Sequence, residues 1–131
     1  MFTMKQVCEQ TQLPYETLKF YCNQGLIPNV KRDKNNHRVF DEKDIMWIQN
    51  LSCLKNCGMS ISEMKDYIAL VLTGDSTIPE RKVILDNKRK TLVEQAKQIQ
   101  DCIAYIDWKQ NLYDKMLSGN VTFEDMQSRE L

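Results

Sequence analysis

The stretch NNHRVF, residues 35–40, holds the only histidine of the chain, His37, directly before Arg38. An imidazole can act as a general base, a metal ligand or a hydrogen-bond donor, and its neighbours decide among these roles. The two asparagines before it place it at a solvated turn, without an apolar pocket. No nucleophile and base are arranged around it, so the sequence predicts a protein that is not an enzyme.

Cysteine is the other residue type here that could do chemistry. Cys53 and Cys57 are four residues apart, so they would share one face of a helix. A zinc site is poorly supported, because only one imidazole is available and no second cysteine pair follows. No glycine-rich phosphate loop is present either. We therefore expect no metal and no cofactor.

Length and composition restrict the class of protein. The chain has 131 residues, which fits one domain or a small domain with an appendage, and 42% hydrophobic residues can supply a core. No apolar run approaches the ~20 residues needed to span a bilayer. The start MFTMKQVCEQ lacks the layout of a signal peptide. We expect a cytoplasmic protein without a membrane partner, whose five cysteines are thiols.

The charge is unevenly distributed although the formal net charge is zero. Between residues 19 and 38 five basic side chains face a single acidic one, Asp33, which leaves this segment at +4. The basic residues are Lys19, Lys31, Arg32, Lys34 and Arg38. A local basic patch can engage DNA phosphates in a neutral chain, although a solvated loop is the alternative.

Two short helices with a tight connection are predicted in the first 25 residues. Thr3 can cap the first helix, Leu13 closes it, and Pro14 occupies a helix-start position. The second helix, YETLKFYCNQ, is expected to stop at Gly25. The pair is a helix-turn-helix candidate, a weak signal when taken alone.

A small β-hairpin is predicted directly after the second helix. Ile27 precedes Pro28, which favours extended backbone, and Asn35-Asn36 suits a turn that needs a positive φ. Val30 and the pair Val39-Phe40 flank this polar tip. The hairpin would form a wing attached to the helix-turn-helix.

Two further helices are expected before a break in the chain. Asp41 can cap the third helix, and Gly58 can end it. Ser60 with Glu63 forms a capping box for the fourth helix. The sequence GDST, residues 74–77, then interrupts the helical pattern.

A long helix is predicted beyond Pro79, because no Gly or Pro follows as far as Leu117. Apolar residues recur there in a heptad pattern that is imperfect at Arg89 and Gln110. The predicted seam is Leu85, Leu92, Ala96, Ile99, Ile103, Ile106, Tyr113 and Leu117. A helix roughly 60 Å long cannot bury this stripe against a small domain, which favours a second copy over a helix folded back on its own domain.

The sequence thus predicts a mainly α protein with three parts. They are a winged helix-turn-helix head at 1–76, a coiled-coil dimerisation helix at 77–117 and a C-terminal tail at 118–131. In this arrangement the second helix enters the major groove, and the wing reaches neighbouring phosphates. The expected DNA contacts are Tyr15, Thr17, Lys19, Phe20, Tyr21, Lys31, Arg32, Lys34, Asn36, His37 and Arg38. Tyr21 could equally be a core residue, and Phe40, Trp47 and Trp108 are expected to be packing residues.

Three stretches of the chain resemble the MerR-type transcriptional regulators. YETLKFYCNQGLIP is similar to the recognition-helix signature of the family, NNHRVFDEKDIMWI to its wing and following helix, and LSCLKNCGMSISEMKDYIAL to its next helix pair. The resemblance covers about residues 2–117. The chain departs from the family where Lys19 replaces Arg, Phe20 replaces Tyr and Cys22 replaces Glu, which puts the operator preference in doubt.

The resemblance implies a homodimer that binds double-stranded promoter DNA and distorts its spacer so that RNA polymerase can engage. The segments GDSTIPERKVILDNKRKTL and YIDWKQNLY resemble the AdhR/NmlR-like branch of aldehyde and thiol stress regulators. That branch implies a sensor role for Cys53. Two alternatives remain: a regulator that senses a non-covalent small molecule, and a coiled-coil adaptor whose small head binds protein.

Overall fold

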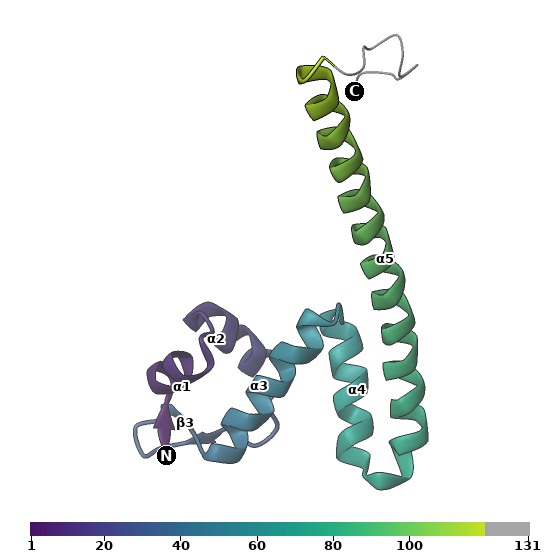
Figure 1. The fold of residues 1–131 in the computed structure, drawn as a ribbon. Coiled ribbons are helices and arrows are strands. Elements are labelled where there is room, and N and C mark those ends of the chain that lie inside the picture. Colours follow the sequence, from purple (N-terminus) through teal and green to yellow (C-terminus); the bar gives the residue numbers. More distant parts are fainter. Residues whose placement is uncertain (120–131) are drawn as a thin grey trace. The chain divides into compact units, whose positions relative to one another are not determined.

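The computed structural model describes residues 1–119 (Figure 1). Most of the tail predicted at 118–131 therefore lies outside the described residues. The chain divides into two compact units, Met1–Lys88 and the part from Arg89 onward. The first unit contains the predicted head and also the first turns of the long helix α5, which spans Ile78–Leu117.

The head begins with a strand and two short helices. β1 (Phe2–Thr3) leads directly into α1 (Met4–Thr11), and α2 (Tyr15–Asn23) follows after a three-residue turn. A capping box starts α1, because Thr3 accepts from the Gln6 backbone N–H and the Gln6 side chain accepts from the Thr3 backbone. Gln12, with φ 61°, then takes the left-handed conformation that ends the helix. The predicted helix-turn-helix is confirmed.

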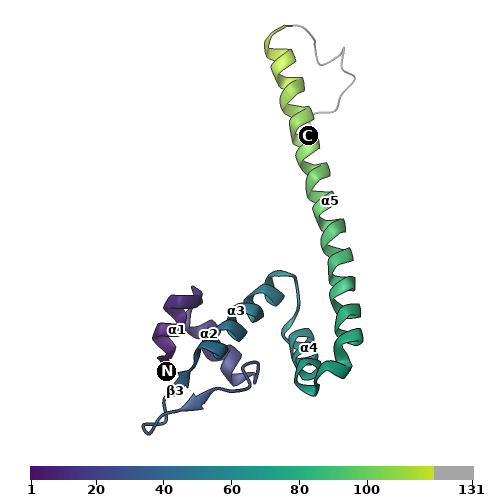
Figure 2. The ribbon, with the colours of Figure 1, turned by 60° about the horizontal axis from the view of Figure 1, so that its bottom comes forward.

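The predicted wing is present, and it belongs to a larger sheet than expected. β2 (Lys31–Arg32) and β3 (Arg38–Phe40) pair antiparallel, with Asn36 at φ 63° in the turn between them. β1 adds to the other side of β3, with Phe2 opposite Phe40, so the strand order is β1-β3-β2. The sequence did not predict β1, because two residues carry no alternation pattern. The wing is thus anchored to the start of α1, as Figure 2 also shows.

Two capped helices complete the head. α3 (Glu42–Asn56) begins with a capping box between Asp41 and Asp44, and α4 (Ile61–Thr73) begins with one between Ser60 and Glu63. A short 3₁₀ turn, η1 (Asp75–Thr77), connects α4 to α5. The core collects apolar side chains from α1, α2, β3, α3 and α4 and from the loops between them. Its buried members are Val7, Leu18, Tyr21, Leu26, Ile27, Phe40, Ile45, Ile48, Leu51, Met59, Met64 and Ile68.

The aromatic packing predictions have different outcomes. Phe40 is fully buried, and Trp47 packs against the core while donating from its indole N–H to the Leu26 carbonyl at 2.8 Å. Trp108 is instead 46% exposed on α5, with its ring centroid 6.1 Å from that of Tyr105. The mainly α fold with a winged helix-turn-helix and a long C-terminal helix is confirmed.

Candidate nucleic-acid interface

The recognition helix α2 presents one face to solvent because its other face is in the core. Leu18 and Tyr21 are 0% and 1% exposed. The positions turned away from them are Glu16, Lys19, Phe20 and Asn23, which share one side of a helix at spacings of three and four. Tyr15 and Phe20 are exposed, and Thr17 is half-buried. Most of the predicted helix contacts are therefore accessible to a groove.

Tyr21 is a correction to the predicted set of contacts. Its side chain is buried, and its hydroxyl has no hydrogen-bond partner among residues 1–119. Burial raises the pKa of this phenol, so it stays neutral. The structure supports the core role for Tyr21 that the sequence left open. Tyr21 holds α2 against the core and offers no contact to DNA.

The wing tip is organised by Asp33, a residue outside the predicted set. Its Oδ1 accepts from the backbone N–H groups of Asn35 at 2.9 Å and His37 at 3.0 Å. These hydrogen bonds, the one from His37 first, lower the pKa of Asp33, so its carboxylate is charged at neutral pH. The His37 side chain is 78% exposed, with Nδ1 3.9 Å from Asp33 Oδ2. His37 is thus a solvated wing-tip residue, as its flanking asparagines predicted.

The wing cations fall into two groups. Lys34 and Arg32 are exposed, and Arg32 donates to the Asn36 carbonyl at 2.9 Å. Lys31 is engaged instead: its Nζ lies 3.0 Å from Asp41 Oδ2 and 3.3 Å from Asp44 Oδ2. The prediction of Lys31 as a phosphate contact needs correction, because its charge is used to attach β2 to the start of α3.

A polar cleft of about 410 Å³ lies where the wing meets the starts of α1 and α2. Its lining includes Lys5, Tyr15, Arg32, His37 and Arg38. Lys5 was missed by sequence reasoning, because nothing local in the first helix indicates that it faces the wing. The carboxylate of Asp33 also lines the cleft, but the three cations Lys5, Arg32 and Arg38 outnumber it. The cleft is therefore a site that can hold a DNA phosphate.

Residues 2–70 of the chain match the family model described as MerR HTH family regulatory protein. The chain belongs to the MerR family. An uncharacterised HTH-type transcriptional regulator of Haemophilus influenzae is 34% identical over 114 residues, 87% of this chain and 84% of the relative. The regulator AdhR of Bacillus subtilis is 43% identical over 89 residues, 68% of this chain and 64% of AdhR.

Solved structures of MerR regulators also match. HiNmlR, a MerR family regulator lacking the sensor domain and bound to promoter DNA, has a TM-score of 0.76 at 33% identity, over 89% of this chain and 93% of its own. A putative MerR family regulator from Listeria monocytogenes has a TM-score of 0.81 at 28% identity, over 92% and 91% of the two chains. This MerR-family protein is therefore a DNA-binding transcriptional regulator of the AdhR/NmlR-like type, and the relatives named here are regulators rather than enzymes.

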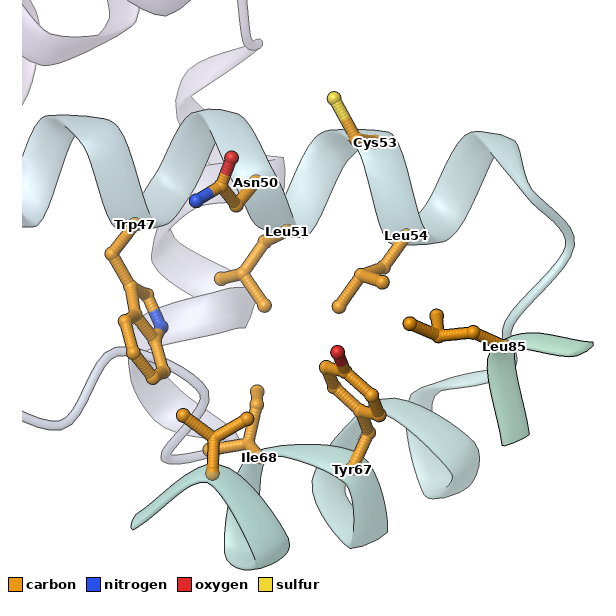
Figure 3. Close-up of a pocket in the computed structure, with 9 residues that line it drawn as sticks. Trp47, Asn50, Leu51, Cys53, Leu54, Tyr67, Ile68 and Leu85 are labelled. Carbon is orange, nitrogen blue, oxygen red and sulfur yellow. The ribbon is translucent and has the colours of Figure 1, made fainter. Parts of the chain in front are cut away.

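The sensor candidate Cys53 lies on α3 beside an apolar pocket of about 370 Å³. Trp47, Leu54, Tyr67 and Leu85 are among the residues that line it. Figure 3 shows that the Cys53 sulfur projects away from this group of apolar side chains. Cys53 and Cys57 are both exposed, and the Cys57 N–H still donates to the Cys53 carbonyl at 3.0 Å, so the helix between them is intact.

The predicted seam residues of this MerR-family protein remain accessible along α5. Past Lys88, the exposed fractions of Leu92, Ile99 and Ile103 are 37%, 60% and 47%. Ala96, Ile106 and Leu117 are also exposed, and Tyr113 is half-buried. Leu85 is also 41% exposed, and in addition it lines the apolar pocket of its own head.

Two structural features are absent from residues 1–119. No helix in this range is long and apolar enough to cross a membrane. Within the same residues, no three or more His, Cys, Asp or Glu side chains come together as a metal site.

Proposed function

We propose that this MerR-family regulator forms a homodimer through the α5 seam and that the dimer binds a two-fold symmetric promoter. The observation that carries the proposal is the row of exposed apolar side chains on α5, which an aqueous environment disfavours. The stripe from Leu92 to Leu117 keeps the heptad spacing that suits a coiled coil. A second copy supplies an identical stripe, and it also supplies the second head that a palindromic site needs.

On the DNA, α2 enters the major groove and the wing follows the backbone. Thr17, Lys19 and Phe20 read the groove, with Lys19 acting as a point charge rather than a bidentate fork. The polar cleft binds the phosphates of the DNA backbone through Arg38, Arg32 and Lys5. Lys34, Asn36 and His37 extend this contact at the wing tip. HiNmlR, which resembles this chain over 93% of its own length, was crystallised with promoter DNA, and that complex supports this assignment.

Regulation would come from distortion of the promoter spacer. DNA deformation costs about 1–10 kcal/mol, so an effector that shifts the two heads slightly can decide whether RNA polymerase engages. We propose that an aldehyde or another electrophile forms an adduct at Cys53 and that this adduct causes the shift of the two heads. Its exposure on α3 gives reagents access. The resemblance of the sequence to the AdhR/NmlR-like branch implies the same sensor role for Cys53.

A second effector hypothesis rests on the apolar pocket between α3, α4 and the start of α5. An apolar ligand could bind there without a covalent bond, since the cavity is within the usual size of small-molecule sites. The coiled-coil adaptor is no longer supported, because the chain belongs to a family of DNA-binding regulators. A regulator of this kind acts in the cytoplasm, where the chromosome is.

A binding and transcription experiment tests the proposal. Fragments of its own genome retained by the protein would be sequenced, and one palindromic promoter fragment would be titrated at several salt concentrations. We expect specific binding by a dimer, a negative salt slope and a change in transcript level from that promoter. Retention of random fragments alone, or binding by a monomer, would contradict it.

A further inference from the structure

The apolar pocket beside Cys53 lies wholly within the first compact unit of the chain, because all nine residues that line it fall between Trp47 and Leu85. They come from α3, from α4 and from the start of α5. The volume of about 370 Å³ lies within the range of about 300–1,000 Å³ that is usual for small-molecule sites. A molecule of that size would contact all three helices at once.

The walls of the pocket are aromatic and well supported. Trp47 and Tyr67 supply one ring from α3 and one from α4 (Figure 3). The Trp47 ring is held in place, because its N–H donates to the carbonyl of the buried residue Leu26 at 2.8 Å. Leu51 and Ile68 also line the pocket and belong to the buried core. Such walls are suited to a flat ring, which gains both apolar contact and favourable ring–ring packing.

The lining of the pocket carries no formal charge. None of its nine residues is Asp, Glu, Lys, Arg or His. A charged ligand would lose its hydration there without gaining an ion partner, which is unfavourable. The pocket therefore selects a neutral molecule.

Two polar groups are available to orient a ligand. The Tyr67 hydroxyl points across the pocket toward Leu51 and Leu54 (Figure 3). Within residues 1–119 no hydrogen bond of this hydroxyl is found. The side chain of Asn50 is exposed and also lines the pocket, so it lies on the solvent side. A ligand hydroxyl or carbonyl group would give the Tyr67 hydroxyl a partner that the protein does not supply.

We propose that this pocket binds a neutral aromatic molecule of one or two rings that carries one hydroxyl or carbonyl group. The rings pack between Trp47 and Tyr67, and the polar group forms a hydrogen bond with the Tyr67 hydroxyl. Binding is non-covalent, since the Cys53 sulfur projects away from the pocket (Figure 3). The effect of this ligand on transcription rests on the proposed function, whereas its binding does not.

The first turns of α5 give the ligand a route to the rest of the molecule. Lys88 Nζ lies 2.8 Å from Glu63 Oε2 at the start of α4, and Arg81 donates to the Gly74 carbonyl at 2.8 Å. Leu85 lies between these two attachments in the sequence and lines the pocket. A bound molecule favours the placement of these turns that gives it the better contacts, which shifts the equilibrium between placements. Because α5 continues into the proposed dimer seam, the shift would reach the DNA-bound heads.

The binding test uses the full chain without DNA and three matched probes. Isothermal titration calorimetry at pH 7 should give a Kd of roughly 1–100 µM for 2-naphthol, which is neutral and carries one hydroxyl group. Naphthalene lacks the hydroxyl group and should bind about fivefold more weakly, the usual effect of one hydrogen bond. 2-Naphthoate is anionic and should bind more weakly than either. Absence of 2-naphthol binding, or tighter binding of 2-naphthoate, would overturn the proposal.

Variants place the probe in the pocket. Val71→Phe fills part of the pocket and should abolish 2-naphthol binding, whereas Val83→Phe makes the same change at an exposed position of α5 outside the lining and should not. Tyr67→Phe should weaken 2-naphthol about fivefold and leave naphthalene unchanged, which keeps the test decisive if Val71→Phe fails to fold. Cys53→Ser should bind like wild type. Equal binding of 2-naphthol by Val71→Phe, Tyr67→Phe and wild type would overturn the site.

The same titrations distinguish a ligand from a second copy of the chain. Leu85 belongs both to the predicted seam and to the pocket, so the partner's stripe is the competing occupant. If the monomeric variant Ile103→Asp bound 2-naphthol and the wild-type dimer did not, the second copy would fill the pocket and the ligand proposal would be overturned. Equal affinity in the two proteins is the expected result.

Transcription is then measured in the Cys53→Ser background, where no adduct can form at that position. We expect 2-naphthol to change the transcript level from the cognate promoter about fivefold, at the low end of the usual range for coupling between sites, and to have no effect when Val71→Phe is added. An unchanged transcript level would overturn the regulatory half. Failure of the protein to bind any promoter would count against the proposed function instead, since calorimetry does not depend on DNA.

Discussion

The Arg38 guanidinium donates to the side-chain oxygen of Asn23 at 2.7 Å, and so joins the wing to the last turn of the recognition helix. Arg38 is half-buried in this position and also lines the polar cleft. One side chain thus fixes the relative placement of two DNA-facing elements and contributes a positive charge at their junction. These two roles can be separated by mutation.

Replacing Arg38 removes both the charge and the hydrogen bond. We expect Arg38→Ala to weaken binding to operator and random DNA alike and to flatten the slope of log K against log salt by about one. Asn23→Ala removes the hydrogen bond but keeps the charge, so its slope should stay unchanged while operator affinity falls. Titrations at four salt concentrations measure both. Wild-type binding by Arg38→Ala at every salt concentration would refute the wing assignment.

Lys31 and Lys5 should behave differently although both are basic residues of the head. Lys31 is held by Asp41 and Asp44, so Lys31→Met should lower thermal stability and leave the salt slope of DNA binding nearly unchanged. Lys5 lines the cleft, so Lys5→Met should flatten the slope by about one and leave thermal stability nearly unchanged. The two variants serve as matched controls. An exchange of the two phenotypes would contradict both assignments.

The junction of wing and α3 should weaken in acid. The backbone N–H of Asp44, and next the Lys31 ammonium, lower the pKa of Asp41. A carboxylate with a lowered folded-state pKa stabilises the fold above its unfolded pKa, and this contribution is lost as the pH falls through the folded pKa. Thermal unfolding should therefore show a loss below about pH 4. In Lys31→Met the loss should be smaller and should be complete at a higher pH, because the folded-state pKa of Asp41 is less depressed without the ammonium. An identical pH profile would exclude this coupling.

The α5 seam should control the oligomeric state. Ile99→Asp and Ile103→Asp each place a charge within the apolar stripe, at a cost of several kcal/mol over the two copies. Sedimentation should find monomers that no longer bind the promoter. Ala104→Asp introduces the same charge next to Ile103 on a different side of the helix, and it should remain a dimer. If Ile103→Asp sedimented like Ala104→Asp, the interface would lie elsewhere.

The effector response should depend on Cys53. Transcription from the cognate promoter is compared with and without an aldehyde for wild type, Cys53→Ser and Cys57→Ser. We expect Cys53→Ser to lose the response and Cys57→Ser to retain it, because no second thiol is needed for an adduct. A full response in Cys53→Ser would instead favour a non-covalent ligand, which variants of Tyr67 in the apolar pocket would then test.

Features set by local chemistry could be predicted from the sequence. The caps at Thr3, Asp41 and Ser60 each depend on a polar side chain and a partner three residues on, and the positive φ of Asn36 depends on its own residue type. All of these were visible within a window of four residues. The resemblance to the MerR family also predicted the order in which the helices and the wing follow one another.

Features set by tertiary contacts could not be predicted in the same way. Lys31 looked like a free cation, because its partners Asp41 and Asp44 are ten and thirteen residues away across the β3 strand. Tyr21 looked as suitable for DNA as for the core, since a tyrosine serves both. The position of Lys5 beside the wing depends on β1, which is too short to leave a pattern in the sequence.

At the connection between α4 and α5, side chains that follow the end of α4 donate hydrogen bonds to backbone carbonyls at that end. Thr77 Oγ1 donates to the Leu70 carbonyl at 2.6 Å, and the Arg81 guanidinium donates to the Gly74 carbonyl at 2.8 Å. A carbonyl in the last turn of α4 and the carbonyl of its C-cap residue are thus held by side chains of η1 and of the first turn of α5. Neither end can fray without breaking bonds made by the other, so the amide protons on both sides of this corner should exchange with solvent as one cooperative unit.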